Sequence, residues 1–416
     1  MDSNSKVMNR WLVVFGAIVI QLCLGAIYAW SVFTPSLKEA GWTAAQTQAV
    51  FSAGLAFFAI VMVIAGRLMP KIGPRNLAMA GGAVLGLGYL FAGLFGGTNF
   101  WPIFIFVGVI GGSGIGLAYV VPIAVGMRWF PDKKGLITGL AVAGFGFGAM
   151  LWVKLAGAWG NLIINVGLSQ TFTIYGIVFF AAVVVGGIWM VFPPEGWKPE
   201  GWNPPEAEAG AKAAGSVNFS SSEMLKTPQF YMILLTFAFG ASAGLMSIGL
   251  MKLFPIQALT DAGVAHASAI AGTAMAVFYS LANGLGRIAW GAMSDKLGRK
   301  TSIIIMMGTQ GIVVILFQWM AGTPALLYLG ATLIGFNFGG NFALFPTITA
   351  DTFGAKFVGQ NYGWVFLAYG IGGIFGPMLG GRLGDMGNFP LAFTICGILC
   401  LVAAGIITLV KPPKTA

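Results

Sequence analysis

Residues 66–75 of the chain read G-R-L-M-P-K-I-G-P-R, and residues 291–300 read G-A-M-S-D-K-L-G-R-K. The two segments share Gly, Lys, an aliphatic residue, Gly and a terminal base in matching places. A second match sets residues 122–148 against 346–372, where a helix end, a short basic loop and a glycine-rich helix follow one another. In an apolar chain, a duplication of this kind predicts two similar bundles with a binding site between them, near the bilayer midplane.

The composition is that of a membrane protein. Of the 416 residues, 57% are hydrophobic and only 8% are charged, and the mean hydropathy is +0.87. Runs of about 18 or more apolar residues predict membrane-spanning helices. Twelve such runs predict an all-α protein with six spans in each half, at 11–33, 45–66, 76–95, 101–126, 136–159, 171–192, 229–251, 268–292, 302–320, 324–348, 361–383 and 390–411.

The two halves are joined by a segment that is too rich in Pro, Gly and charge to pack as a core. We therefore predict an N-terminal six-helix bundle at 1–192, a cytoplasmic linker at 193–228 and a C-terminal six-helix bundle at 229–416. Within the linker, Ser220 and Glu223 have the spacing of a capping box. This spacing predicts a short helix that leads into the seventh span.

The distribution of basic residues predicts the orientation in the membrane. With both termini in the cytoplasm, seventeen of the 22 Lys and Arg residues fall on that side, as the positive-inside rule requires. This bias accounts for the net charge of +10 and leaves no basic patch for nucleic acid. The three cysteines fall within spans and indicate neither a disulfide framework nor a metal site. No cofactor is expected.

Arg287 lies within the eighth predicted span. An arginine at a span centre costs roughly 2.5–3.5 kcal/mol on insertion scales. It could snorkel to the headgroups, because only about 12 Å of helix rise separates it from Asp295. However, Asn283 lies one turn away on the same face, and a polar stripe suits a cavity better than lipid. We expect Arg287 to bind a carboxylate, because its planar fork donates two parallel hydrogen bonds.

Other polar and aromatic residues are weaker candidates. Lys154 lies near the outer end of the fifth span, where its ammonium group could instead reach water. All twelve acidic residues fall in tails, loops or span ends, so no buried carboxylate is expected to relay protons. Transport would then be anion exchange, facilitated movement, or symport in which proton binding depends on the substrate carboxylate. Aromatic residues beside Gly, Pro or Asn are candidates for lining a cavity: Tyr28, Trp30, Tyr119, Phe338 and Phe342.

The paired basic loops among twelve spans resemble the signature of the major facilitator superfamily. Four further segments are together similar to the oxalate:formate antiporter family, which in turn resembles the monocarboxylate transporters: R-W-F-P-D-K-K-G-L-I-T-G (128–139), S-E-M-L-K-T-P-Q-F (222–230), N-F-A-L-F-P (341–346) and N-Y-G (361–363). The resemblance implies two bundles that work by alternating access, with Arg287 in the place of the family's substrate-binding arginine. It also implies that Tyr28, Trp30 and Tyr119 line the central cavity.

The same resemblance implies a singly charged substrate. Oxalate carriers of the family have a second cation, a lysine, where this chain has Tyr369, and a Trp and a Tyr where it has Phe338 and Phe342. With one cation, the second carboxylate of oxalate would be buried without a partner. The hypothesis is a proton-linked secondary active transporter of small monocarboxylates such as lactate, pyruvate, acetate or formate. Asn283 would orient the carboxylate, and Tyr119 and Tyr369 would offer hydroxyl groups.

Two alternatives stay open. Lys154 could supply the missing cation, which would favour oxalate:formate-type exchange, and a carboxylate sensor that transports nothing is more remote. An enzyme is not expected, because no nucleophile, base and orienting group converge. We expect the protein to be a monomer in the bacterial inner (plasma) membrane. Its expected partners are the lipid bilayer and a small carboxylate, with or without a proton. Loop residues that fit both a cytoplasmic gate and the positive-inside rule are Lys71, Arg75, Asp295, Arg299 and Lys300.

Overall fold

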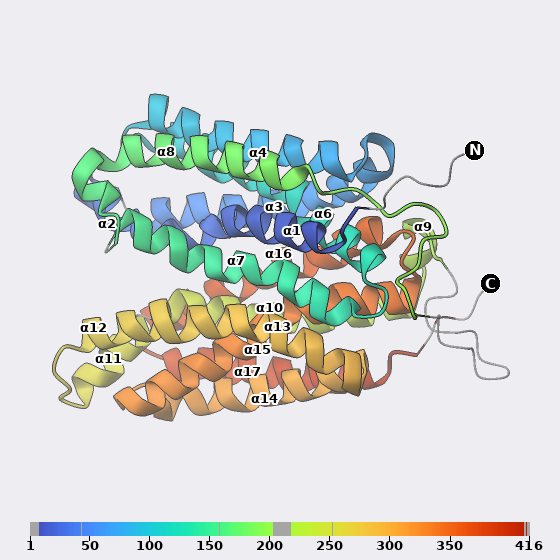
Figure 1. The fold of residues 1–416 in the computed structure, drawn as a ribbon. Coiled ribbons are helices and arrows are strands. Elements are labelled where there is room, and N and C mark those ends of the chain that lie inside the picture. The colour runs from blue at the N-terminus through green and yellow to red at the C-terminus, as the bar shows by residue number, and fades with distance from the viewer. Residues whose placement is uncertain are drawn as a thin grey trace.

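The computed structural model describes residues 8–42, 44–157, 159–202, 218–251, 253–411 and 413. Within these ranges the chain is helical and contains no β-strand, as the apolar runs predict (Figure 1). Eleven helices are long and apolar enough to cross a membrane, so the chain is a multi-pass membrane protein. The tenth predicted span, which is not one of these eleven, is also a helix: α15 (Pro324–Phe353) has 30 residues.

The helices form two bundles of six spans each (Figure 1). The first bundle contains α1 (Trp11–Leu24), η1 (Gly25–Val32), α2 (Thr34–Glu39), α3 (Ala44–Ile72), α4 (Pro74–Phe91), η2 (Ala92–Gly96), α5 (Phe100–Ile103), η3 (Phe104–Gly111), α6 (Gly112–Trp129), α7 (Lys134–Ala156) and α8 (Leu162–Gly187). The second contains α10 (Pro228–Leu250), α11 (Leu253–Asp261), α12 (Ala267–Thr273), η4 (Ala274–Tyr279), α13 (Ser280–Leu297), α14 (Arg299–Met320), α15, α16 (Val358–Asp385) and α17 (Phe389–Thr408).

The two bundles repeat the same packing pattern. In the first, α1 packs on α7, α4 on α8 and α3 on α6; in the second, α10 packs on α16, α14 on α17 and α13 on α15. The bundles contact each other mainly through α7 with α13 and α3 with α16 (Figure 1). These two contacts are equivalent in the repeat, because each joins the second span of one half to the fifth span of the other.

Glycines allow the bundles to approach closely. A Cβ atom on Gly291 of α13 would meet the carbonyl oxygen of Gly135 on α7, and one on Gly139 would meet the carbonyl oxygen of Arg287. On the other side, a Cβ atom on Gly66 of α3 would meet the backbone of α16. Small residues of this kind let membrane helices pack backbone to backbone. The contact between α7 and α13 therefore brings the backbone of Arg287 directly against the other bundle.

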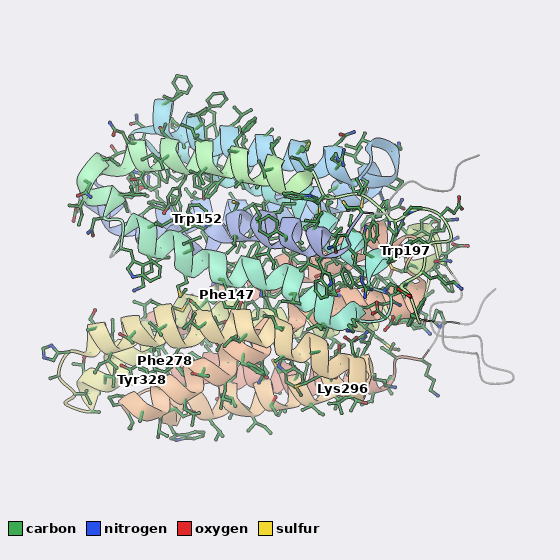
Figure 2. The ribbon with its side chains drawn as sticks, viewed as in Figure 1. Phe147, Trp152, Trp197, Phe278, Lys296 and Tyr328 are labelled. Atoms are coloured by element: carbon green, nitrogen blue, oxygen red, sulfur yellow. The ribbon has the colours of Figure 1, made fainter. Side chains whose placement is uncertain are left out.

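The described residues of the linker, 193–202 and 218–228, lie at the end of the bundles where α1 begins and α17 ends, which we call the linker end (Figure 1). Its short helix α9 (Ser221–Met224) begins with the capping box predicted from the sequence. The Glu223 backbone N–H donates to Ser220 Oγ at 3.4 Å, and the Ser220 backbone N–H donates to Glu223 Oε2 at 2.7 Å. Before the undescribed part of the linker, Trp197 packs on Trp129 of α6, with ring centroids 4.8 Å apart (Figure 2).

Candidate functional site

Arg287 lies on α13 at the contact with α7, and its side chain is completely buried. Its Nε donates to Asn283 Oδ1 at 3.2 Å, and its Nη1 donates to the carbonyl oxygen of Val142 on α7 at 3.0 Å. Its Nη2 is buried without a hydrogen-bond partner among the described residues. The guanidinium thus faces the other bundle and is not extended toward the headgroups.

Aromatic rings lie against the guanidinium, and no carboxylate of the described residues pairs with it. The ring centroid of Phe342 lies 4.0 Å from Arg287 Cζ, and that of Phe145 lies 5.3 Å away, within the range of cation–π attraction. The four ion pairs in the described ranges all lie at the linker end and do not include Arg287. Sequence reasoning selected Phe342 but missed Phe145, although its setting in G-F-G-F-G indicates a closely approached helix.

Three tyrosines surround the same point. The Tyr119 hydroxyl is buried without a hydrogen-bond partner in the described part of the chain. The hydroxyls of Tyr28 and Tyr369 hydrogen-bond to each other and so join η1 of the first bundle to α16 of the second. Tyr28 and Tyr119 both lie close enough to Arg287 to interact with its charge. The structure therefore gathers Arg287, Asn283 and these three hydroxyls from four helical segments of both bundles.

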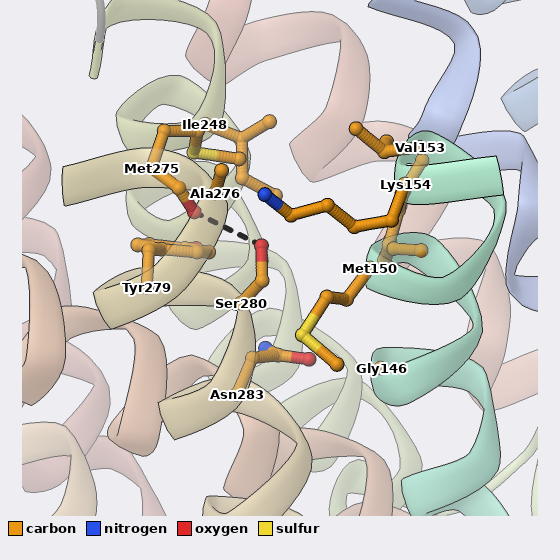
Figure 3. Close-up of a pocket in the computed structure, with 12 residues that line it drawn as sticks. Gly146, Met150, Val153, Lys154, Ile248, Met275, Ala276, Tyr279, Ser280 and Asn283 are labelled. Atoms are coloured by element: carbon orange, nitrogen blue, oxygen red, sulfur yellow. Dashed lines mark hydrogen bonds between the residues drawn. The ribbon is translucent and has the colours of Figure 1, made fainter. Parts of the chain in front are cut away.

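A cavity lies between the bundles (Figure 3). Its lining does not include Arg287 itself, but it includes Ser280 and Asn283, which precede Arg287 on α13. Its volume is about 650 Å³, including the part that is open to solvent. Five side chains with polar atoms line it: Tyr28, Lys154, Tyr279, Ser280 and Asn283. Its remaining lining is apolar and comprises Gly146, Ala149, Met150, Val153, Ile248, Met275 and Ala276.

Trp30 and Phe338 lie outside this cluster. Trp30 lines a separate, smaller cavity inside the first bundle with Tyr89 and other residues of α3, η3 and α6. Residues two apart on a helix do not share a face, which is why Tyr28 and Trp30 point to different places. Phe338 is buried one layer behind Phe342, with ring centroids 5.3 Å apart, and is not among the residues that line the main cavity.

Polar contacts between the bundles close the linker end. The Asp295 carboxylate accepts hydrogen bonds from the backbone N–H groups of Gly135 and Leu136, at 2.9 and 2.8 Å, in the first turn of α7. A carboxylate is stabilised at a helix N-terminus by the unpaired N–H groups and the helix dipole. Arg299 pairs with the same carboxylate at 2.6 Å. Asp295 is therefore in direct contact with the opposite bundle.

A second contact at the linker end was not foreseen from the sequence. Lys134 at the start of α7 pairs with Asp351 of α15 at 3.0 Å and thus joins the two bundles. The sequence feature that could have indicated this contact is the charged D-K-K run within the segment 128–139. Lys300 instead donates to a backbone carbonyl just after α17, within its own bundle. Lys71 and Arg75 are exposed, and no hydrogen bond or ion pair joins them to other described residues.

The family model described as Major Facilitator Superfamily matches the chain over residues 11–277 and 245–416. The chain is 30% identical over 379 residues to an uncharacterized MFS-type transporter of Escherichia coli, YhjX, covering 90% of this chain and 88% of that protein. It is 28% identical over 417 residues to the oxalate:formate antiporter of Oxalobacter formigenes, covering 99% and 94%. It is 24% identical over 461 residues to apicoplast pyruvate carrier 1 of Toxoplasma gondii, covering 88% and 82%.

Solved structures resemble the fold as well. A variant of the Escherichia coli fucose:proton symporter, FucP, superposes with a TM-score of 0.70 at 13% sequence identity. The superposition covers 97% of this chain and 98% of that chain. At this level of identity the likeness concerns the arrangement of two six-helix bundles and carries no information on the substrate.

Proposed function

Because the chain belongs to the major facilitator superfamily, we propose that it is a secondary active transporter of small monocarboxylates such as lactate, pyruvate, acetate or formate. It is a transporter and not an enzyme. The similarity to an oxalate:formate antiporter and to a pyruvate carrier supports a small organic anion as the substrate. Arg287 binds the carboxylate, and the two bundles rock about this site to expose it alternately to the two sides of the membrane.

The proposal depends most on one observation: Arg287 is a buried cation that forms no ion pair among the described residues. Removing a charge from water costs several kcal/mol unless a partner of opposite charge and hydrogen bonds compensate for it. Arg287 has two neutral acceptors and two aromatic faces, but its Nη2 and the nearby Tyr119 hydroxyl have no partners among the described residues. One carboxylate could accept hydrogen bonds from both groups, and Asn283 holds the guanidinium in place for it.

The environment of the site favours one negative charge and a short apolar tail. Tyr369 contributes a hydroxyl where a second cation would be needed to hold both carboxylates of oxalate close to Arg287. Phe342 covers the face of the guanidinium, and the cavity beside it has walls of Met, Val, Ile and Ala side chains. A methyl or ethyl group would replace water against these walls, which is favourable at about 25 cal/mol per Å² of apolar surface.

Proton coupling would require no acidic relay within the bundles. None of the acidic side chains that the structure describes is buried. The proton would therefore move with the substrate carboxylate, as in net transport of the acid. We place the protein in a bacterial inner membrane with the linker and both termini on the cytoplasmic side. The cavity then faces outward. The cytoplasmic side is closed by Asp295 and Arg299 and by the ion pair between Lys134 and Asp351. A monomer is sufficient for this mechanism.

Uptake into proteoliposomes tests this function. Vesicles containing the purified protein are given labelled lactate with and without an inward proton gradient, and unlabelled pyruvate, acetate, formate and oxalate are added as competitors. The expected result is gradient-driven accumulation of lactate that the monocarboxylates inhibit more strongly than oxalate. Lack of lactate uptake in both conditions would refute the proposal.

One observation favours a second candidate, oxalate:formate-type exchange. Lys154 is a cation that lines the same cavity as Asn283 and Tyr28. In this candidate, Lys154 and Arg287 would together hold the two carboxylates of oxalate, which requires their charged groups to come within the length of one oxalate ion. The distinguishing result would be rapid exchange of external formate in oxalate-loaded vesicles that shows no response to a proton gradient.

A further inference from the structure

Lys154 lies in the last turn of α7, at the end of the cavity that is remote from the linker end. Figure 3 shows its side chain extending from α7 across the cavity toward Ser280 and Met275 of the opposite bundle. None of the ion pairs among the described residues includes it. The centroid of the Trp159 ring lies 6.0 Å from the Lys154 Nζ atom. Among the described residues the lysine thus has no anionic partner, and its positive charge faces the cavity.

The backbone positions of Lys154 and Arg287 lie at different levels along the interface between the bundles. Ser280, which faces the lysine, precedes Arg287 on the same helix by seven residues, or about 10.5 Å of helix rise. On α7, Lys154 follows Val142, the residue whose carbonyl oxygen binds Arg287, by twelve residues, or about 18 Å of rise. The two cations thus lie at different levels along the route that a substrate would take between the bundles.

The surroundings of the ammonium group indicate the class of ligand. Met150, Val153, Ile248 and Met275 form an apolar wall beside it. The Ser280 hydroxyl is already engaged, because it donates to the carbonyl oxygen of Met275 at 3.0 Å (Figure 3). A single charge next to an apolar wall suits an anion with one carboxylate and a short alkyl group. A phosphate or a dicarboxylate would keep an additional charge without a partner against this wall.

We propose that Lys154 forms an outer anion site, at which a monocarboxylate docks before it passes to Arg287. This inference rests on the proposed function. The outer site concentrates anions at the cavity mouth, since charge in a cleft with low-dielectric walls raises the local concentration of counter-ions. One charge at about 4 Å in water changes affinity about fivefold. Removing it should raise KM for external substrate by about that factor and leave the maximal rate within about twofold of wild type.

The test restores the charge chemically at the same position. The three native cysteines are buried, so K154C provides one accessible thiol in right-side-out vesicles. K154C should show the raised KM for lactate at low ionic strength. Treatment with a membrane-impermeant cationic methanethiosulfonate reagent should return KM to within about twofold of wild type, whereas the anionic sulfonate reagent should raise it further.

Two controls make the result specific. R382Q removes an exposed cation from the same end of the molecule, outside the cavity, and should leave KM unchanged. In about 1 M salt, where the screening length falls to about 3 Å, the difference between wild type and K154Q should largely disappear. An unchanged KM in K154Q at low salt, or a complete loss of transport in K154C that the cationic reagent does not reverse, would overturn the inference. If the wild type transports no monocarboxylate, the proposed function fails first, and the outer site fails with it.

Discussion

Asp295→Asn should weaken the closure of the linker end. The carboxylate accepts backbone hydrogen bonds from Gly135 and Leu136 at 2.9 and 2.8 Å, at the N-terminus of α7. Asparagine keeps one acceptor oxygen, so the closed state loses one of these bonds and the charge. The bond contributes about 1 kcal/mol, and a charge at a helix N-terminus that water can reach contributes about 0.5 kcal/mol. The closed state is therefore destabilised by about 1.5 kcal/mol, which is slightly more than tenfold in the ratio of closed to open molecules.

Distances between spin labels at the linker end measure this shift. The labels are attached to cysteines that replace two exposed residues, Lys133 on the first bundle and Lys296 on the second (Lys296 is labelled in Figure 2). The native cysteines are buried. Double electron–electron resonance should show a larger population at long distance in the Asp295→Asn protein. Asp261→Asn, which removes an exposed acid from α11 at the opposite end, serves as the control and should leave the distribution unchanged. A distribution identical to that of wild type in Asp295→Asn would show that this carboxylate does not hold the linker end closed.

Three further predictions concern packing, the site and the linker. Gly139→Ala places a Cβ atom against a carbonyl oxygen of α13 and should lower the melting temperature, because overpacking costs about 1–3 kcal/mol. Gly308→Ala, whose Cβ atom meets no neighbouring atom within 4 Å, should leave the melting temperature unchanged. Tyr369→Phe removes the hydroxyl that bridges the bundles and should raise KM for lactate about fivefold in the uptake assay, the equivalent of one neutral hydrogen bond. Ser220→Ala should speed amide exchange in α9 about fivefold, because an N-cap contributes roughly 1 kcal/mol. Hydrogen bonds from Ser220 lower the pKa of Glu223. The protection of α9 from exchange in the wild type should therefore be complete above the usual glutamate pKa of 4.5 and should decline as the pH falls through the lowered pKa. Exchange that does not vary with pH in this range, after correction for its intrinsic rate, would contradict the cap.

The fold could be predicted because it follows from local patterns. Each span needs only a run of apolar residues, and the capping box at Ser220 and Glu223 needs only a spacing of three residues. The hydrogen bond between Arg287 and Asn283 was also accessible from the sequence, because residues four apart share a helix face. Each of these features depends on residues that are close in the chain.

Contacts between the bundles could not be predicted in the same way. Lys134 and Asp351 are separated by 217 residues, and their meeting depends on how α7 and α15 are rotated and crossed. The same holds for Phe145, which reaches Arg287 only because glycines let α7 and α13 come together. Whether Lys154 faces the cavity also depended on the rotation of α7, which an apolar helix with little amphipathic pattern does not reveal.

The most direct test of the account is lactate uptake by Arg287→Lys and Arg287→Gln in proteoliposomes, with Arg382→Gln as the control for loss of an exposed positive charge. Truncating one partner of a buried, hydrogen-bonded charge pair costs about 2–5 kcal/mol, so the Arg287→Gln protein should lose at least about thirtyfold in kcat/KM. Lysine should restore little, since it cannot supply the bidentate fork. Because the buried arginine forms no ion pair with the other described residues, both variants should still fold, with melting temperatures close to that of wild type. Folded Arg287→Gln protein that takes up lactate at the wild-type rate would contradict the central claim that this arginine binds the carboxylate.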